Sequence, residues 1–447
     1  MVYKITFCIS LYFIVCCHIP LFGQDSNYQK PAVKWNLQQC LDYSDKHNFA
    51  LNTLRLNKET AAQNLVVSKS AVLPGVTGTM QQSVTNSNNT NPVVGGLQSE
   101  ASFTSNYGIS SSFTLYNGGY LKDDIRQKAL LVQSVNLNIL QQGNDNTLFI
   151  TQAYLNILLA KENIIYEIDL LKTSDAELNL GQQQFNAGSI AKVSLIELEA
   201  QKATDKFNLV TAENLQRQNI LNLKQLLLLP SNLAFDIAVP DTLIAFATIP
   251  SLDTVIQVAS ANRPEIKNSE LNRQIAHLDL VKAKTGYLPL ISIGASLASG
   301  YSDNESVNYT KQLDNNFYQQ IGLTLSIPIF SKAVNSTNVE KAKIGIRQSE
   351  FTLMNTKTVL SQTVEQAYIN VLNAQAQYDA SLEQLKFTSE SYRIAREELK
   401  AGAVNLVDLL VQKNLYVQSL QSYISAKYST ALYIRIYNFY YGIPVHL

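Results

Sequence analysis

The chain has 447 residues, and its 35 lysines and arginines balance 35 aspartates and glutamates. A formal net charge of zero gives no overall field that would attract nucleic acid, and the sequence contains no basic stripe. Apolar residues make up an ordinary 46% of the chain, but Gln, Asn and Ser are abundant along the helical runs, a composition typical of helices that bury one stripe and leave the rest in water.

The first residues have the pattern of a secretory signal peptide. Lys4 provides a positive start, residues 5–17 form a largely apolar run, and Gly23 precedes a cleavage point at Gln24. A run this short does not span a hydrocarbon layer of ~30 Å. We therefore expect residues 1–23 to be removed on export, with a lipidated N-terminus as the weaker alternative.

The remaining chain offers neither a disulfide nor a spanning helix. Three of the four cysteines lie in the signal, so Cys40 is alone in the mature chain and has no partner for an intrachain disulfide. No later run approaches the ~18 apolar residues of a spanning helix. Any crossing of a membrane would then have to use strands.

Each half of the chain opens with a helical pattern that a proline ends. Apolar residues recur at three- and four-residue spacings from Trp35 to about Ser70, ahead of Pro74. The second half repeats this pattern over residues 252–284, ahead of Pro289. Proline cannot continue a helix and restricts the residue before it, so we expect a change of structure at both places.

Two strands follow in each half. They cover about residues 75–86 and 100–115 in the first half, and about 290–301 and 316–329 in the second. Within 101–115 most odd positions are apolar and all even positions are small or polar, and the second strand of the other half repeats this parity. A polar loop joins the two strands of each pair.

This alternation fits either a soluble sheet with one wet face or a membrane barrel that is apolar outside. The second strand of each pair runs for about 13 residues, beyond the ~9–11 needed to cross a bilayer. The inward set is small and uncharged, which favours the barrel. Because the smallest membrane barrels have about eight strands and open edges in lipid are unsatisfied, several chains must share one barrel.

A very long helical hairpin follows each pair of strands, over about residues 120–229 and 332–441. Residues 120–185 contain no proline, and at ~1.5 Å per residue such an arm reaches about 100 Å. That length exceeds any globular core, so neighbouring arms are expected to pack as coiled coils.

The hairpins are copies of one another. Each turns at a glycine, Gly188 in the first and Gly402 in the second, 214 residues apart. The run Gln152-Ala153-Tyr154 returns at the same spacing as Gln366-Ala367-Tyr368. A constant spacing means equal arms and a duplicated chain.

The predicted fold is mostly helical, with two long hairpins that form an α-barrel and four strands per chain in a shared β-barrel. The predicted units are a first repeat over 24–229, a connector over 230–250 and a second repeat over 251–447. Prolines at positions 230, 240 and 250 mark the connector, which we expect to cross the outside of the body with two short strands.

The mature chain offers no recognisable catalytic or metal-binding constellation. Its histidines, His47, His277 and His446, are not at ligand spacing from one another, and no nucleophile elbow, phosphate loop or zinc-protease motif is present. Cys40 and His47 could share a helix face, but a packed cysteine and a surface histidine is the simpler interpretation. We predict no enzyme activity, no cofactor and no bound metal.

The two glycine turns are candidates for docking with a partner. Glycine at a helix end often serves only as a cap, but equal arms place both turns at one level, where tips from several chains would surround the mouth of a tube. Exposed small apolar residues at such tips favour contact with another protein. The candidate contact residues are Gly188, Ser189, Ile190, Gly402, Ala403 and Val404.

Taken in order, the paired strands, the duplication and the glycine-tipped hairpins resemble the TolC family of outer-membrane efflux proteins, over about residues 35–442. The resemblance implies a homotrimer in the cell outer membrane, with a twelve-stranded barrel in contact with lipid and a long periplasmic tunnel. It also implies a periplasmic adaptor at the tips and an inner-membrane pump that supplies energy, with no role for nucleic acid.

The family's tip pattern places an acidic residue about six positions after the glycine, and Gly402 and Asp408 match it. By this resemblance Asp408 would line the periplasmic aperture, where three copies would attract cations. An ordinary solvated carboxylate is the alternative. The first hairpin departs from the pattern, because Ser194 occupies the corresponding position.

The predicted function is therefore a trimeric outer-membrane exit channel of a tripartite efflux or type I secretion system, which conducts cargo passively. The alternative is a periplasmic coiled-coil adaptor or scaffold without a pore. Adaptors normally carry a lipoyl-like or barrel domain between their hairpin arms, and none is visible here. No motif names the cargo.

Overall fold

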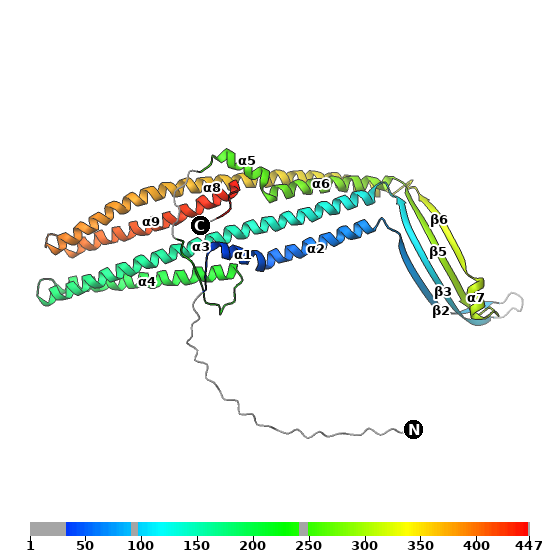
Figure 1. The fold of residues 1–447 in the computed structure, drawn as a ribbon, viewed down its shortest axis with the longest axis horizontal. Helices are drawn as coiled ribbons and strands as arrows, with labels where there is room; N and C mark the ends of the chain where they lie inside the picture. Colours follow the sequence, from blue (N-terminus) through cyan, green and yellow to red (C-terminus); the bar gives the residue numbers. More distant parts are fainter. Residues whose placement is uncertain (1–32, 91–96, 241–248, 446–447) are drawn as a thin grey trace, which may run out of the picture.

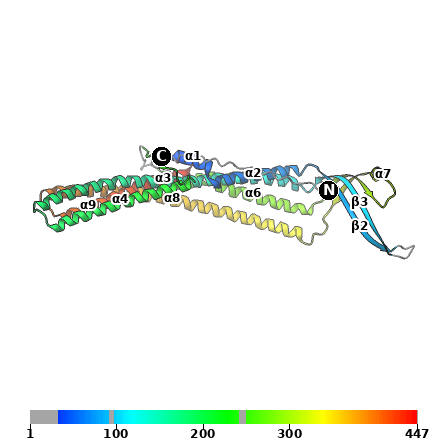
Figure 2. The same cartoon turned by 90° about the horizontal axis from the view of Figure 1, so that it is seen from below.

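The computed structural model describes residues 33–90, 97–240 and 249–445, with side chains described outside residues 87–100. The predicted signal peptide, residues 1–23, lies outside this part of the chain. The molecule is long and narrow, with a helical body and a sheet at one end (Figure 1). A quarter turn about the long axis shows the same narrow body (Figure 2).

The opening helix of each half is broken in two, where the sequence predicted continuous helices. In the first half the break is Asn48, whose extended backbone ends one helix and whose side chain accepts the amide of Leu51 at 3.1 Å to begin the next. In the second half Arg263 is extended because Pro264 follows it and starts the next helix. The four helices are α1 Leu37–His47, α2 Phe49–Ser70, α5 Leu252–Asn262 and α6 Pro264–Lys284.

Two helical hairpins form the length of the body. The outgoing helices, α3 Tyr120–Asn186 and α8 Val334–Lys400, have 67 residues each. The returning helices are α4 Lys192–Leu226 and α9 Leu406–Tyr441. Both turns lie at the end of the body farthest from the sheet (Figure 1), so the predicted equal arms are present.

The sheet at the other end is antiparallel, in the order β2–β3–β5–β6. Its strands are β2 Gly75–Thr90, β3 Leu97–Tyr116, β5 Leu290–Ser302 and β6 Tyr318–Ser326. The first two extend farther than predicted. The last is shorter than the predicted 316–329 because Pro328, which lacks an amide hydrogen, follows close behind it.

The sequence predicted only a polar loop between the last two strands, whereas in the structure this loop is partly helical. It contains a short helix, α7 Tyr309–Asn315, whose start is capped by the side chain of Asn308. The buried Gln312 of this helix donates to the carbonyls of Ser302 and Val307 at 2.9 and 2.7 Å. These bonds hold α7 against the end of β5.

The main core lies midway along the body, where the connector meets the hairpins. Strand β4, Phe235–Ile237, pairs in parallel with β1, Val33–Trp35. Fully buried Tyr154 packs beneath them and donates its hydroxyl to the Ala238 carbonyl at 2.5 Å. The second predicted connector strand lies mostly in residues 241–248, outside the described part. The C-terminal helix also reaches the connector, because Tyr437 donates to the Pro250 carbonyl at 3.0 Å.

The predicted fold class is confirmed: the chain is mostly helical, with duplicated long hairpins and four strands gathered into one sheet. The sharing of a barrel among several chains remains a prediction, and so do the boundaries of the two repeats.

Candidate functional site: the sheet and the hairpin tips

The two faces of the sheet differ in chemistry. The register places Val76, Ile109, Leu297 and Ile321 on one face, together with most other large apolar side chains of the strands. The opposite face carries mainly hydroxyl, amide and glycine residues, with Leu290 at the end near the helices, and with no lysine, arginine, aspartate or glutamate on its described part. Its members include Thr77, Thr79, Gln81 and Ser83 on β2, Thr104, Asn106, Ser110, Ser112 and Thr114 on β3, Ser292, Ser296 and Ser302 on β5, and Gln320 and Thr324 on β6.

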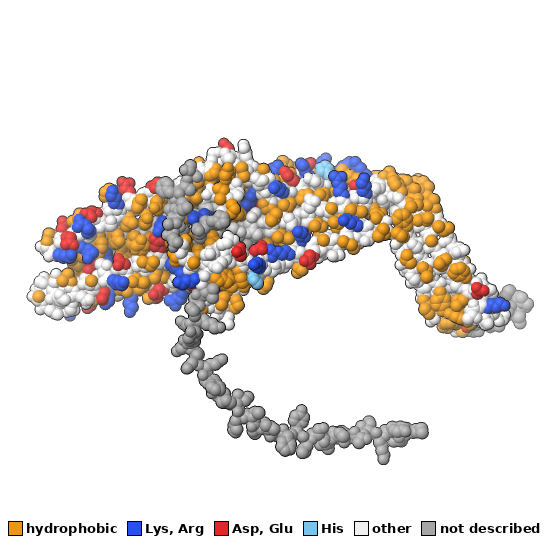
Figure 3. Space-filling model, viewed as in Figure 1, with side chains coloured by type: hydrophobic (Ala, Val, Ile, Leu, Met, Phe, Trp, Pro, Cys, Tyr) orange, Lys and Arg blue, Asp and Glu red, His pale blue; other side chains and the backbone are white. Residues whose placement is uncertain are grey.

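Aromatic side chains lie near both ends of the sheet. At the outer end the hydroxyls of Tyr107 and Tyr309 lie 2.9 Å apart, and the rings of Tyr301 and Tyr309 are 5.0 Å apart. At the end near the helices, Tyr116 and Phe330 are exposed. Aromatic belts of this kind lie at the two interfaces of a bilayer. Figure 3 shows few charged side chains over the strands and many along the helices.

Both hairpin tips are capped in the same way. At the first tip the amide of Gly188 donates to the Phe185 carbonyl at 2.9 Å, and that of Ser189 donates to Gln184 at 2.9 Å. At the second tip Gly402 and Ala403 make the equivalent bonds. The glycines have φ of 74° and 75°, the left-handed conformation in which a side chain is strained. These bonds satisfy carbonyls that a helix end leaves free.

The start of the returning helix differs between the tips. Asn405 accepts the backbone amide of Asp408 at 2.9 Å and so caps α9. Ala191 occupies the equivalent position before α4 and provides no side-chain cap. The Asp408 carboxylate is exposed in the first turn of α9, whereas Ser194 is half-buried in the first turn of α4.

The tips are less exposed than the sequence predicted. Ser189 and Ala403 are exposed, but Ile190 and Val404 are half-buried. Ile190 turns back toward Gly181, where a Cβ atom added to the glycine would lie 3.8 Å from the Ile190 Cδ1 atom. A cavity of about 580 Å³ separates the tips, and five of the predicted residues line it, namely Ser189, Ile190, Ser194, Gly402 and Val404. Gly188, Ala403 and Asp408 lie outside that lining.

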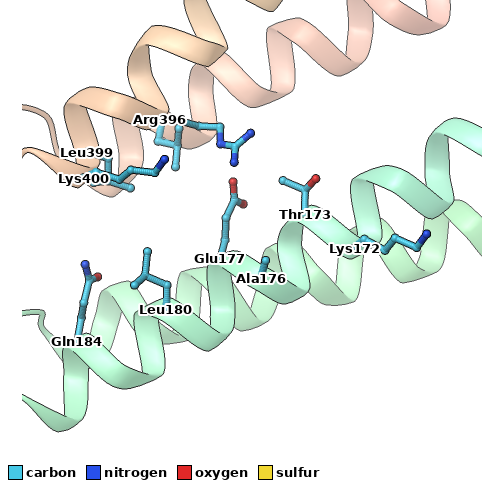
Figure 4. A pocket seen from close by; sticks show the side chains of 10 residues that line it. Lys172, Thr173, Ala176, Glu177, Leu180, Gln184, Arg396, Leu399 and Lys400 are labelled. Atoms are coloured by element: carbon cyan, nitrogen blue, oxygen red, sulfur yellow. The ribbon is translucent and has the colours of Figure 1, made fainter.

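A second cavity, of about 320 Å³, continues along the groove between α3 and α8 (Figure 4). Lys172 and Glu177 line it from α3, and Arg396 and Lys400 line it from α8. In Figure 4 the Glu177 carboxylate and the Arg396 guanidinium point toward one another across this groove. The two hairpins are therefore parted near their tips by a groove with charged walls.

A buried ion cluster joins the hairpins beneath this groove. The ammonium of Lys413, on α9, is fully buried and lies 3.1 Å from Asp205 Oδ2, 3.4 Å from Glu177 Oε2 and 2.5 Å from Ser174 Oγ. Ser174 also donates to Asp205. From α8, the hydroxyl of Tyr392 donates to Glu177 at 2.9 Å, and burial raises the pKa of Tyr392 far above its usual range.

This cluster was not predicted from the sequence. A signal was present, because Lys413 follows buried Leu409 by one helical turn and precedes buried Leu420 by two, which places a lysine on the apolar stripe of α9. A charge on such a stripe needs a buried partner. Its partners lie on the other hairpin, more than 200 residues away in the sequence.

No helix within residues 33–90, 97–240 and 249–445 combines the length and the apolar content needed to cross a membrane. Over the same ranges, no cluster of three or more His, Cys, Asp or Glu side chains is arranged to hold a metal ion.

Comparison with known proteins gives a consistent result. A family model described as "Outer membrane efflux protein" matches residues 41–227 and 255–432. Outer membrane protein TolC of Vibrio cholerae is 22% identical over 410 residues, which cover 88% of this chain and 87% of that protein.

Solved channel structures share the fold. A CusC structure aligns with a TM-score of 0.79 at 17% identity, covering 93% of this chain and 95% of its own. The CmeC outer membrane channel of Campylobacter jejuni aligns with a TM-score of 0.77 at 19% identity, covering 91% and 85%. The resemblance inferred from the sequence is confirmed, and this chain belongs to the outer membrane efflux protein family.

Proposed function

We propose that three copies of this chain form an outer-membrane exit channel of a tripartite efflux or type I secretion system, which conducts cargo passively from the periplasm to the outside. The sheet would form one third of a twelve-stranded membrane barrel. The hairpins would form a tunnel that extends into the periplasm.

The observation that carries this proposal is the two-faced sheet with open edges. Its apolar face, near aromatic residues at both ends, suits lipid, and its polar face, uncharged among the described side chains, suits a water-filled lumen. Among the described residues, the four strands leave two edges of the sheet unpaired, and lipid cannot satisfy them. Three chains provide twelve strands, enough to enclose an aqueous pore.

The partners follow from the position of the tips. A periplasmic adaptor would contact Gly188, Ser189, Ile190, Gly402, Ala403 and Val404. An inner-membrane pump behind the adaptor would supply the energy, because the chain carries no recognisable site for nucleotide chemistry. Half-burial of Ile190 and Val404 means that the adaptor would meet mainly the small and polar members of this set.

The proposal is tested by reconstituting the purified protein in a planar bilayer. We expect a discrete conductance from a species whose mass in detergent equals three chains. A protein that stays monomeric and gives no conductance, or that leaves the outer-membrane fraction on washing with salt, is instead the poreless adaptor or scaffold.

Asp408 and Ser194 are proposed to line the periplasmic aperture. Three exposed Asp408 carboxylates would attract cations, so Asp408→Ala is expected to lower the cation-over-anion permeability ratio by roughly twofold or more. Ser194→Ala is the matched control, because it changes the equivalent position without removing a charge. An unchanged reversal potential in Asp408→Ala would show that this residue does not line the aperture.

A further inference from the structure

In the part of the chain that the structure describes, the edge strands β2 and β6 each have one side without a partner strand. All nine residues of β6 are exposed. Successive strands of the sheet are antiparallel, so β6 of one copy can pair antiparallel with β2 of the next. Building on the trimeric channel proposed above, we propose that this seam is shifted by about four residues, which sets Ile321 opposite Met80 and Gln320 opposite Gln81 of the neighbouring copy.

The direction of the shift comes from the pairing inside the chain. Gly75, Ser112, Gly294 and Gly322 form one row of directly opposite residues across the sheet. The row starts at the first residue of β2, yet it crosses β6 four residues before that strand ends at Ser326. From β2 to β6 the row therefore lies progressively farther from the helical end of the sheet. It then reaches β2 of the neighbouring copy at a residue that follows Gly75.

Closure of the barrel limits the size of the shift. Twelve strands tilted by roughly 35–45°, spaced by ~4.8 Å and rising ~3.3 Å per residue, accumulate a shift of about 12 to 18 residues around the barrel. Threefold symmetry divides this shift among three equal seams. Because side chains alternate between the faces, each share must be even, which leaves about four or about six residues per seam.

Complete pairing supports a shift of this size. With about four or about six residues, every residue of β6 lies opposite a residue of β2. Without a shift, the end of β6 beyond Gly322 would lie opposite residues that precede Gly75 and belong to no strand. Unpaired backbone groups in lipid are costly, so the unshifted seam is disfavoured.

The outward side chains distinguish between the two shifts. With about four residues, large apolar side chains meet one another or glycine, and Gln319, the one outward amide of β6, meets Gln82 of β2. The pairs are Leu325–Val76, Leu323–Gly78, Ile321–Met80 and Gln319–Gln82. With about six, Ile321 would lie opposite Gln82 and Gln319 opposite Val84, which separates the two amides at the lipid-facing surface.

Paired cysteines test this register. Gln320→Cys is combined in turn with Gln81→Cys, Thr77→Cys and Ser83→Cys, which report a shift of about four, none and about six residues. All four positions lie on the polar face, where an oxidant in water reaches them. The matched control is Ser296→Cys with Gln320→Cys, because these residues are directly opposite within one chain. Native Cys40 stays in place, since it is fully buried.

After mild oxidation of the intact assembly, we expect the pair at 320 and 81 to give a covalent trimer on a non-reducing gel. Disulfides need Cα atoms about 4.4–6.8 Å apart, so the other two pairs should react at least ~10-fold more slowly. Faster reaction of either other pair overturns this register and leaves the trimer intact. If the control oxidises and no pair links two chains, the seam itself is wrong, and the conductance and mass of the same protein then show whether the channel proposal fails with it.

Discussion

The hairpin α3–α4 and the hairpin α8–α9 share arm lengths and caps, but their interiors differ in charge. At the constant spacing of 214 residues, Asp205 corresponds to Ser419 and Glu167 corresponds to Ser381, and all four are buried. Ser174 corresponds to Thr388, so the Ser174–Asp205 contact of the first hairpin matches the Thr388–Ser419 hydroxyl pair of the second. The first hairpin holds carboxylates where the second holds hydroxyls.

This difference couples the two copies. A hydroxyl pair is satisfied within its own hairpin, whereas a buried carboxylate needs a cation. Lys413 of the second hairpin supplies that cation to Asp205 of the first. This difference in charge between the two copies makes each hairpin depend on the other near the tips.

Removing the buried cation is expected to have the largest effect. Lys413→Met leaves buried Asp205 and half-buried Glu177 without their ammonium partner, which costs about 3–5 kcal/mol. This loss of stability should appear as faster hydrogen exchange of the amides of α4 and α9 near the cluster. Lys400→Met is the control, because the Lys400–Glu397 pair is exposed and its loss should change exchange little.

The cycle with Asp205→Ser makes the first hairpin resemble the second. In the double variant Lys413→Met, Asp205→Ser, most of the lost protection should return, since Asp205 is no longer left without its cation. If the double variant instead loses as much protection as the two single variants combined, the hairpins are stabilised independently and the coupling is absent.

Packing between the arms gives the next largest difference. Gly181 on α3 leaves room for Leu198 on α4, because an added Cβ atom would lie only 2.3 Å from its Cδ1 atom. The corresponding residue of the second hairpin is Ala395, which is buried without such a constraint. Gly181→Ala should therefore destabilise the first hairpin by about 1–3 kcal/mol.

The control is Gly143→Ala, on the same helix, where an added Cβ atom has open space. Helix propensity alone should make this variant more stable by up to about 1 kcal/mol. Thermal unfolding or hydrogen exchange should then show opposite signs for the two substitutions. The same sign in both would mean that α3 and α4 separate easily enough to accept a methyl group.

The unpaired carboxylate of Glu167 should make the first hairpin sensitive to pH. Burial raises the pKa of Glu167, a hydrogen bond from Gln421 partly opposes the rise, and the nearby Asp205 adds to it. Its Oε2 atom has no hydrogen-bond partner. The stability linked to this group is fully present below its ordinary pKa of 4.5 and is lost as the pH rises through the raised folded-state value.

Glu167→Gln removes the ionised form. At neutral pH the free energy of opening of the first hairpin, measured by hydrogen exchange, should therefore be about 1 kcal/mol higher in this variant than in the native protein. This advantage should shrink as the pH is lowered toward 4.5. Glu383→Gln, at an exposed position of α8, should show no such trend. A constant difference at all pH values would mean that Glu167 is neutral throughout.

The features that repeat along the sequence were predictable. The alternation in 100–115 and the equal spacing of Gly188 and Gly402 depend on local periodicity, and they led to the sheet and the hairpins. The breaks at Asn48 and Arg263 were missed because the apolar spacing continues through them; the capping Asn48 marks the first break, and Pro264 was the available signal for the second. The Lys413 cluster was missed because its members come from four different helices, and no local pattern encodes such a meeting.

The smallest expected difference concerns the starts of the returning helices. Asn405 caps α9, whereas Ala191 leaves the first amides of α4 without a side-chain acceptor. Ala191→Asn has a backbone already suited to a cap, with φ of −75° and ψ of 154°, so it should stabilise the first turn of α4 by about 0.5–1 kcal/mol. Asn405→Ala should cost α9 a similar amount. Hydrogen exchange of the first-turn amides measures both. If neither variant changes exchange there, contacts between the two tips hold these turns, and the difference in capping has no energetic consequence.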